Sequence, residues 1–138
     1  MVTPMSTHER QSARVLVADG EEKVLRVVSS TLEKAGFEVL TAGNRSAAIE
    51  ACRKQTRPIQ LAIVDTAIPG NGHELVEQLY ECQPGIRILF TSVQDEPETI
   101  HAVGPSGQPR GFLRKPFRRS QLLGRVLNAI DAPLVATA

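Results

Sequence analysis

Four polar residues stand where short apolar runs of the sequence stop: Asp19, Asp65, Thr91 and Lys115. Two carboxylates, a hydroxyl and an ammonium form a set that suits phosphoryl transfer. A carboxylate can act as a nucleophile that forms an acyl phosphate. Carboxylate oxygens are ligands for Mg²⁺, while a lysine and a hydroxyl can stabilise phosphoryl oxygens. The four residues are far apart in the chain, so this chemistry requires a fold that brings them together.

Short β-rich runs alternate with longer segments of helical period. Between the runs, and after the last, apolar residues recur at helical spacing, and Asn44 is a predicted helix cap. The segment 94–110 contains several prolines and glycines, so we expect no more than a short helix there, at 97–103. The predicted strands are Val15–Ala18, Phe37–Thr41, Ile59–Val64, Ile86–Phe90 and Gly111–Arg114.

Strands that alternate with helices favour an α/β fold, in which helices cover both faces of a parallel sheet. Right-handed crossovers leave few topologies for such a chain. Ligands of open parallel sheets bind at the carboxyl ends of the strands. Asp19, Asp65, Thr91 and Lys115 each follow a predicted strand. The sequence therefore predicts that the four residues share one crevice.

Composition narrows the class of protein. The chain has 138 residues, a net charge of +1 and 4% aromatic residues. This size predicts one domain, and neither the charge nor the aromatic content favours direct nucleic-acid binding. No apolar run approaches the ~20 residues of a membrane span, so a cytoplasmic protein without membrane contact is expected. Cys52 and Cys82 lack metal-ligand spacing and are predicted to be reduced thiols.

Three segments resemble the receiver domain of bacterial two-component response regulators. Ile63–Gly70 resembles the phosphoacceptor segment, Phe112–Phe117 the lysine segment, and Thr91 with Ser92 the hydroxyl position. Each segment alone is weak evidence for the family, but their order and spacing, together with Asp19, are specific to it. The loop before the fifth strand is most similar to receivers attached to hybrid histidine kinases.

The resemblance implies a flavodoxin-like (βα)5 fold, a three-layer sandwich with strand order 2-1-3-4-5. The receiver domain is expected at 14–131, with a disordered tail at 1–13 and a flexible tail at 132–138. The chain is expected to be a monomer or a weak dimer.

The resemblance also implies a role for each matching residue. Asp65 is expected to accept a phosphoryl group from a histidine kinase or a histidine phosphotransfer domain, and Lys115 to pair with the phosphoryl oxygens. Thr91 and Phe112 are expected to move on activation and to switch the surface of the fourth strand, the fifth strand and the last helix. The peptide bond before Pro116 is expected to be cis.

The metal site departs from the family pattern. Mg²⁺ is expected on Asp19, Asp65 and the backbone carbonyl of Ala67. Members of the family usually carry two adjacent acids after the first strand, whereas this chain has Asp19 followed by Gly20. Loss of a ligand lowers metal affinity. Two alternatives stay open: Glu21 or Glu22 replaces the missing carboxylate, or the chain is a pseudo-receiver that works as a phosphorylation-independent interaction module.

A different class of function is also considered. A small phosphatase or hydrolase could use Asp65 as its nucleophile, but Ala67 stands where such an enzyme needs a general acid, so no metabolic enzyme is expected.

The C-terminal stretch is basic and is interpreted either as a partner-binding patch or as an ordinary solvated face. Its basic residues are Arg110, Arg114, Lys115, Arg118, Arg119 and Arg125.

Overall fold

Five parallel strands form one sheet in the order β2-β1-β3-β4-β5. The computed structural model describes residues 13–96 and 102–135 of the chain. Each strand lies within two residues of its predicted bounds, so the predicted α/β flavodoxin-like fold and strand order are confirmed. The strands are β1 (Arg14–Ala18), β2 (Glu38–Ala42), β3 (Leu61–Asp65), β4 (Arg87–Ser92) and β5 (Arg110–Arg114).

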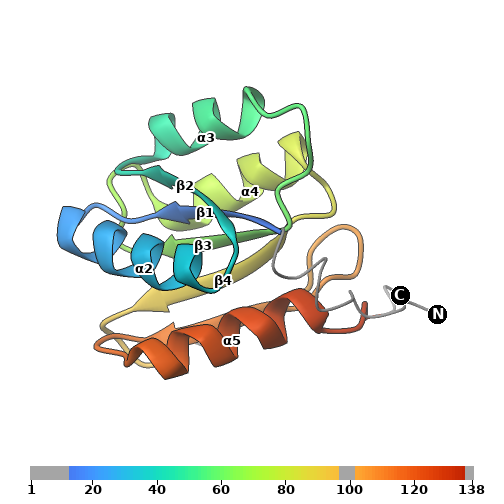
Figure 1. The fold of residues 1–138 in the computed structure, drawn as a ribbon. Helices are drawn as coiled ribbons and strands as arrows, with labels where there is room; N and C mark the ends of the chain where they lie inside the picture. Colours follow the sequence, from blue (N-terminus) through green and yellow to red (C-terminus); the bar gives the residue numbers. More distant parts are fainter. Residues whose placement is uncertain (1–12, 97–101, 136–138) are drawn as a thin grey trace.

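Helices cover both faces of the sheet (Figure 1). α2 (Glu22–Lys34) and α5 (Arg119–Asp131) lie on one face, while α3 (Arg45–Arg53) and α4 (Gly72–Cys82) lie on the other. Asn44 caps α3 as predicted, because its side chain accepts a hydrogen bond from the backbone N–H of Ala47 at 2.8 Å. No helix among the described residues is long and apolar enough to cross a membrane.

The sheet separates two apolar cores. Val15 and Val17 of β1 pack on the side of α2 and α5, whereas Leu16 and Ala18 pack on the side of α3 and α4. This alternation follows from the two-residue period of a strand. β3, at the centre of the sheet, is buried along its whole length. Burial on both faces fixes the register of the strands, and with it the positions of the residues at their ends.

The connection from β4 to β5 differs from the other crossovers. The short helix expected at 97–103 lies mostly outside the described residues. Of the part that is described, Val103 forms an isolated antiparallel bridge with Pro109.

A buried glutamine holds this connection against the sheet. Gln108 donates hydrogen bonds to the backbone carbonyls of Pro84, at 2.6 Å, and Ile86, at 2.8 Å. Val135, beyond the end of α5, donates its backbone N–H to the carbonyl of Gly107. The entry to β5 is therefore fixed by contacts with the start of β4 and with the chain after α5.

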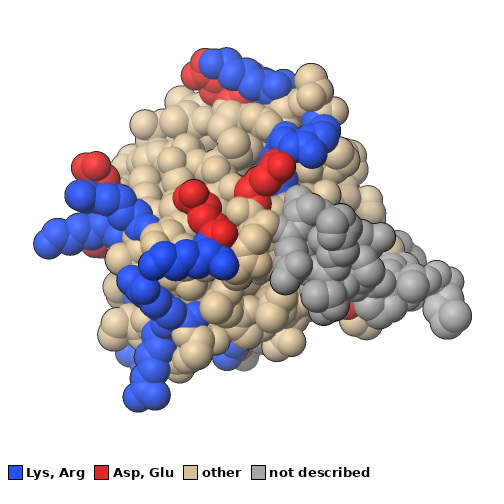
Figure 2. Space-filling view, viewed as in Figure 1, with Lys and Arg blue, Asp and Glu red and all other residues tan. Residues whose placement is uncertain are grey.

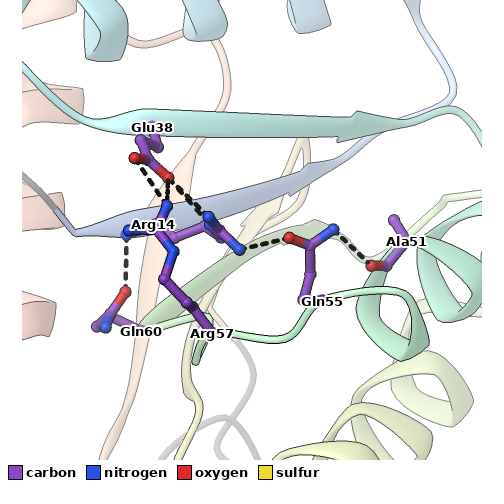
Figure 3. Close-up of polar contacts among 6 residues, drawn as sticks. All are labelled: Arg14, Glu38, Ala51, Gln55, Arg57 and Gln60. Atoms are coloured by element: carbon purple, nitrogen blue, oxygen red, sulfur yellow. Dashed lines mark hydrogen bonds and ion pairs between the residues drawn. The ribbon is translucent and has the colours of Figure 1, made fainter.

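A polar network lies at the amino ends of β1 and β2 (Figure 3). The Arg14 guanidinium donates to Glu38, at 2.9 and 3.1 Å, and to Gln55, at 2.5 Å. Its backbone N–H donates to the side chain of Gln60 at 2.7 Å, and Arg57 donates to Glu38 at 2.7 Å. Hydrogen bonds from Arg57 and Arg14 lower the pKa of Glu38. The network joins β1 and β2 to the connection between α3 and β3.

Candidate functional site

The four predicted site residues meet at the carboxyl end of the sheet. Asp19 directly follows β1, Asp65 ends β3, and Lys115 directly follows β5. Thr91 lies in β4 and is paired in register with Asp65. The Lys115 Nζ is 2.6 Å from the Asp19 Oδ2 and 3.3 Å from the Asp65 Oδ2. One ammonium therefore bridges two carboxylates that are 46 positions apart in the sequence.

Asp19 is held by both of its carboxylate oxygens. Oδ1 accepts a hydrogen bond from the backbone N–H of Glu21 at 2.8 Å, and Oδ2 accepts one from the Lys115 ammonium at 2.6 Å. Its backbone N–H donates to the carbonyl of Ala42 on the neighbouring strand β2 at 3.0 Å. Only 2% of the residue is exposed. Asp19 is therefore a fixed, buried negative charge that the Lys115 ammonium compensates.

Asp65 is also buried, with 8% of the residue exposed. Its Oδ1 accepts the backbone N–H of Ala67 at 3.1 Å, and its Oδ2 faces Lys115. The adjacent Thr66 donates its backbone N–H to the carbonyl of Thr91 at 3.0 Å. These contacts orient a carboxylate at the end of a rigid central strand, which is a suitable position for a nucleophile.

The charge of Lys115 results from two opposing effects. Burial acts to lower its pKa, but the hydrogen bond and charge of Asp19, together with the charge of Asp65, outweigh burial and hold the pKa above its ordinary value. Lys115 is therefore an ammonium throughout the neutral range. Its backbone N–H donates to the carbonyl of Ser92 at 2.7 Å, and the bond to Pro116 is cis, as expected.

The two predicted switch residues lie inside the molecule. Thr91 is buried at the end of β4, beside Asp65 in the register. Phe112 is buried in the core on the side of α3 and α4, and it is paired in register with Phe90. The carbonyl of Phe112 accepts a hydrogen bond from Arg125 of α5 at 2.5 Å. A direct contact therefore joins the strand that carries Phe112 to the last helix.

The donors available to a metal are oxygens of the kind that Mg²⁺ prefers. They are the carboxylates of Asp19 and Asp65 and the carbonyl of Ala67. Among the described residues, no group of three or more His, Cys, Asp or Glu side chains could hold a metal. Asp19 is already bonded to Lys115, so a cation at this position competes with the ammonium. The donor set fits Mg²⁺ in kind, but it holds only two carboxylates.

The loop that carries Pro69 leaves little space for a side chain at position 20. A Cβ added to Gly20 would lie 2.9 Å from the Cδ of Pro69, closer than real side chains pack. Glu21, the expected replacement ligand, is exposed before α2 and borders a surface groove of about 410 Å³ that Lys115 and Phe117 also line. The groove brings Glu21 near the lysine side of the site, and no contact joins its carboxylate to Asp19 or Asp65 among the described residues.

The sequence did not predict that Arg45 holds the loop after Asp65 in place. Arg45, the first residue of α3, donates its backbone N–H to the carbonyl of Pro69 at 2.9 Å and pairs with Glu74 of α4. Gly70 has a φ of +100°, and a Cβ there would collide with the Cβ of Arg45. The glycine was a local signal for this turn, but its partner Arg45 is 25 positions away.

The basic residues of the C-terminal stretch fall into two groups. Arg110 pairs with Glu77 at 3.2 Å and lies over the ring of Tyr80, and Arg114 pairs with Asp95 at 3.1 Å. Arg118 and Arg119 are exposed where α5 begins. Figure 2 shows lysine and arginine side chains projecting from the side of the molecule formed by α2 and the start of α5. The exposed part of the basic stretch therefore lies next to Lys115 in sequence and beside the site.

The sequence matches known response regulator receivers along most of its length. Residues 15–127 match the family model of the response regulator receiver domain. The response regulator receiver protein CpdR of Brucella abortus is 32% identical over 127 residues, which cover 89% of this chain and 98% of that protein.

Solved structures share the fold. The chemotaxis response regulator CheY4 of Vibrio cholerae has a TM-score of 0.74 and 29% identity, covering 86% of this chain and 98% of that one. The receiver domain of the hybrid histidine kinase CckA has a TM-score of 0.72 and 24% identity, covering 86% and 99%. Other curated relatives are longer than this chain, which spans 51% of the length of one and 18% of another.

Proposed function

The chain belongs to the response regulator receiver family, and we propose that it serves phosphorelay signalling by accepting a phosphoryl group on Asp65. The donor is a phosphohistidine of a histidine kinase or of a histidine phosphotransfer domain. The observation that carries this assignment is the Lys115 ammonium at 3.3 Å from the Asp65 carboxylate, at the carboxyl end of a parallel sheet. An ammonium at that distance from the nucleophile is placed to meet the oxygens of an incoming phosphoryl group.

The transfer step follows from these positions. An oxygen of the Asp65 carboxylate attacks the phosphorus, and the bond from phosphorus to the donor histidine nitrogen breaks as the acyl phosphate forms. Lys115 shifts its hydrogen bonding toward the phosphoryl oxygens, while Asp19 keeps the ammonium in place. The backbone N–H of Ala67 steadies the carboxylate during the attack. When bound by Asp19, Asp65 and the carbonyl of Ala67, Mg²⁺ would neutralise charge on the phosphoryl oxygens.

The signal is proposed to leave through β4, β5 and α5. Thr91 lies beside Asp65 and can move toward the new phosphoryl group, and Phe112 lies one strand further along the sheet. The hydrogen bond from Arg125 to the carbonyl of Phe112 connects that strand to α5. A rearrangement of Thr91 and Phe112 would therefore alter the surface that an output partner contacts.

A second candidate function is favoured by one observation. A Cβ at position 20 would lie 2.9 Å from the Cδ of Pro69, so the site lacks an acid at this position and has little room for one. This arrangement supports a pseudo-receiver, in which the fold binds its partner without phosphorylation.

Titration with beryllofluoride, a mimic of the aspartyl phosphate, separates the two candidates. We expect saturable shifts of the amide signals of Asp65, Thr91 and Lys115 when beryllofluoride is added with Mg²⁺, and no such shifts in Asp65→Asn. Unchanged signals in the wild type at millimolar Mg²⁺ would reject phosphoryl acceptance and leave the pseudo-receiver.

A further inference from the structure

The two cysteines lie on neighbouring helices, away from the site. Cys52 is in the last turn of α3, and Cys82 is the final residue of α4. The two helices pack side by side on one face of the sheet (Figure 1). Cys52 is buried, with 1% exposed, whereas Cys82 is only partly buried and packs against the same apolar core. The fold thus brings together two thiols that are 30 positions apart in the sequence.

The environments of the two thiols differ. Burial, followed by the direct interaction with Cys82, raises the pKa of Cys52 to about 12, so its thiol is protonated at neutral pH. Cys82 lines a surface cavity of about 510 Å³, together with Gln55 and Gln83. A small solute in that cavity reaches Cys82 but not Cys52. Cys82 is therefore the accessible thiol, and Cys52 is a buried thiol of the apolar core against which Cys82 packs.

We propose that Cys52 and Cys82 form an oxidisable dithiol that closes to a disulfide between α3 and α4 when the protein meets a peroxide. The proposal goes beyond the phosphorelay function, because neither cysteine contributes to the site of Asp65 and Lys115. It also extends the prediction of two reduced thiols: these are the resting state, and disulfides formed in a reducing compartment are typically transient and redox-sensing.

The chemistry takes place in two steps. Cys82 gives its thiol proton to solvent, its thiolate attacks one oxygen of hydrogen peroxide, and the O–O bond breaks to leave a sulfenic acid and a hydroxide, which takes up a proton to become water. The Cys52 sulfur then attacks the Cys82 sulfur, the S–O bond breaks, and the oxygen leaves as a second water after taking the thiol proton. Two thiols and one peroxide give one disulfide and two waters. Because the thiolate is the nucleophile, Cys52 must give up its thiol proton in the second step.

The experiment treats the full chain with hydrogen peroxide under native conditions and measures its mass and free thiols. We expect a loss of two hydrogens and of both thiols, and a Cys52–Cys82 linked peptide pair after digestion. Because the bond closes a loop of 30 residues, the midpoint of thermal unfolding should rise by roughly 10 °C, and dithiothreitol should reverse the rise.

Two variants test the order of the steps. In Cys52→Ala, Cys82 should stop at a sulfenic acid that dimedone traps, whereas Cys82→Ser should stay unmodified at the same peroxide concentration. The proposal is overturned if the wild type ends as a Cys82 sulfinic acid, as a dimer linked through Cys82, or with both thiols intact. Each of these outcomes can be read in the mass spectrum whether or not Asp65 accepts a phosphoryl group.

Discussion

The two ends of the sheet carry charged clusters of opposite character. At the amino end, Glu38 is partly exposed and accepts hydrogen bonds from two arginines, Arg14 and Arg57. At the carboxyl end, two buried carboxylates, Asp19 and Asp65, share the single ammonium of Lys115. Within the first cluster positive charge is therefore in excess, and within the second negative charge, although the chain as a whole is nearly neutral.

The difference separates a structural cluster from a reactive one. At the amino end Glu38 and Arg57 are exposed, so water screens their charges and their ion pair adds little to stability, although the Arg14 side chain is mostly buried. At the carboxyl end the two carboxylates are desolvated and under-neutralised, and they gain from any further positive charge. A site of this kind attracts a metal ion, and its lysine can turn to an incoming phosphoryl group. Substitutions at the carboxyl end should therefore affect both phosphorylation and stability, whereas substitutions at the amino end should affect stability alone, and by less.

The largest effect is expected at Asp65. Asp65→Asn removes the nucleophile and should abolish phosphorylation by phosphoramidate, a donor with the same phosphorus–nitrogen bond as phosphohistidine. The matched control is Glu38→Gln, the same loss of one carboxylate charge at the other end of the sheet, which should leave phosphorylation unchanged. Intact-mass spectrometry measures both. A phosphorylated fraction in Asp65→Asn equal to that of the wild type would place the reaction elsewhere.

The next largest effect is expected at Lys115. Lys115→Met leaves Asp19 and Asp65 buried without their cation and should lower the free energy of unfolding by about 2 kcal/mol. Urea denaturation at neutral pH measures the loss. In the double variant with Asp65→Asn the additional loss from Lys115→Met should be smaller, because one of the two opposed carboxylates is gone. Additive losses would mean that Lys115 does not couple the two carboxylates.

A smaller effect is expected where the site lacks its acid. Gly20→Ala and Gly20→Asp both place a Cβ against Pro69 and should each lower the free energy of unfolding by about 1 kcal/mol. Only Gly20→Asp adds a carboxylate, so it alone should raise Mg²⁺ affinity, by about tenfold or more. Calorimetry of Mg²⁺ binding compares the two variants. Equal affinities would show that the Pro69 loop keeps the new carboxylate away from the metal.

Much of the site could be predicted because its positions follow from local signals. Asp19, Asp65, Thr91 and Lys115 each come where an apolar run stops, and the parallel sheet then places all strand ends at one edge. The family resemblance added the roles, which the pattern alone does not contain. The pairing of Lys115 with both carboxylates was not predicted, since it depends on the distance between strand ends across the sheet.

Contacts between loops could not be predicted from local patterns. Gly20 indicated from the sequence that a ligand is missing. The close approach of Pro69 to Gly20, however, depends on how the loop after β3 folds against the end of β1. The contact between Cys52 and Cys82 likewise depends on the packing of α3 on α4 rather than on any spacing in the sequence. In both cases the physical determinant is a tertiary contact between segments that carry no shared motif.

The smallest expected effect is a difference in pH dependence between the two ends. The pKa of Lys115 is raised, so its stabilising contribution is complete below the ordinary value of 10.5 and is lost as pH rises through the folded-state pKa. The pKa of Glu38 is lowered, so its contribution is present above the ordinary value of 4.5 and is lost as pH falls through the folded-state pKa. Alkaline and acidic conditions therefore weaken opposite ends of the sheet.

Thermal unfolding across the pH range tests this difference with one variant for each end. The stability gap between wild type and Lys115→Met should narrow as pH rises above about 10.5, and the gap between wild type and Glu38→Gln should narrow as pH falls below about 4.5. Added salt should reduce the Glu38 gap more, because the Glu38 carboxylate is about half exposed, whereas Asp19 and Asp65 are buried. Equal sensitivity of the two gaps to salt would mean that the lysine cluster is as well solvated as the arginine cluster, and the contrast between a reactive and a structural end would fail.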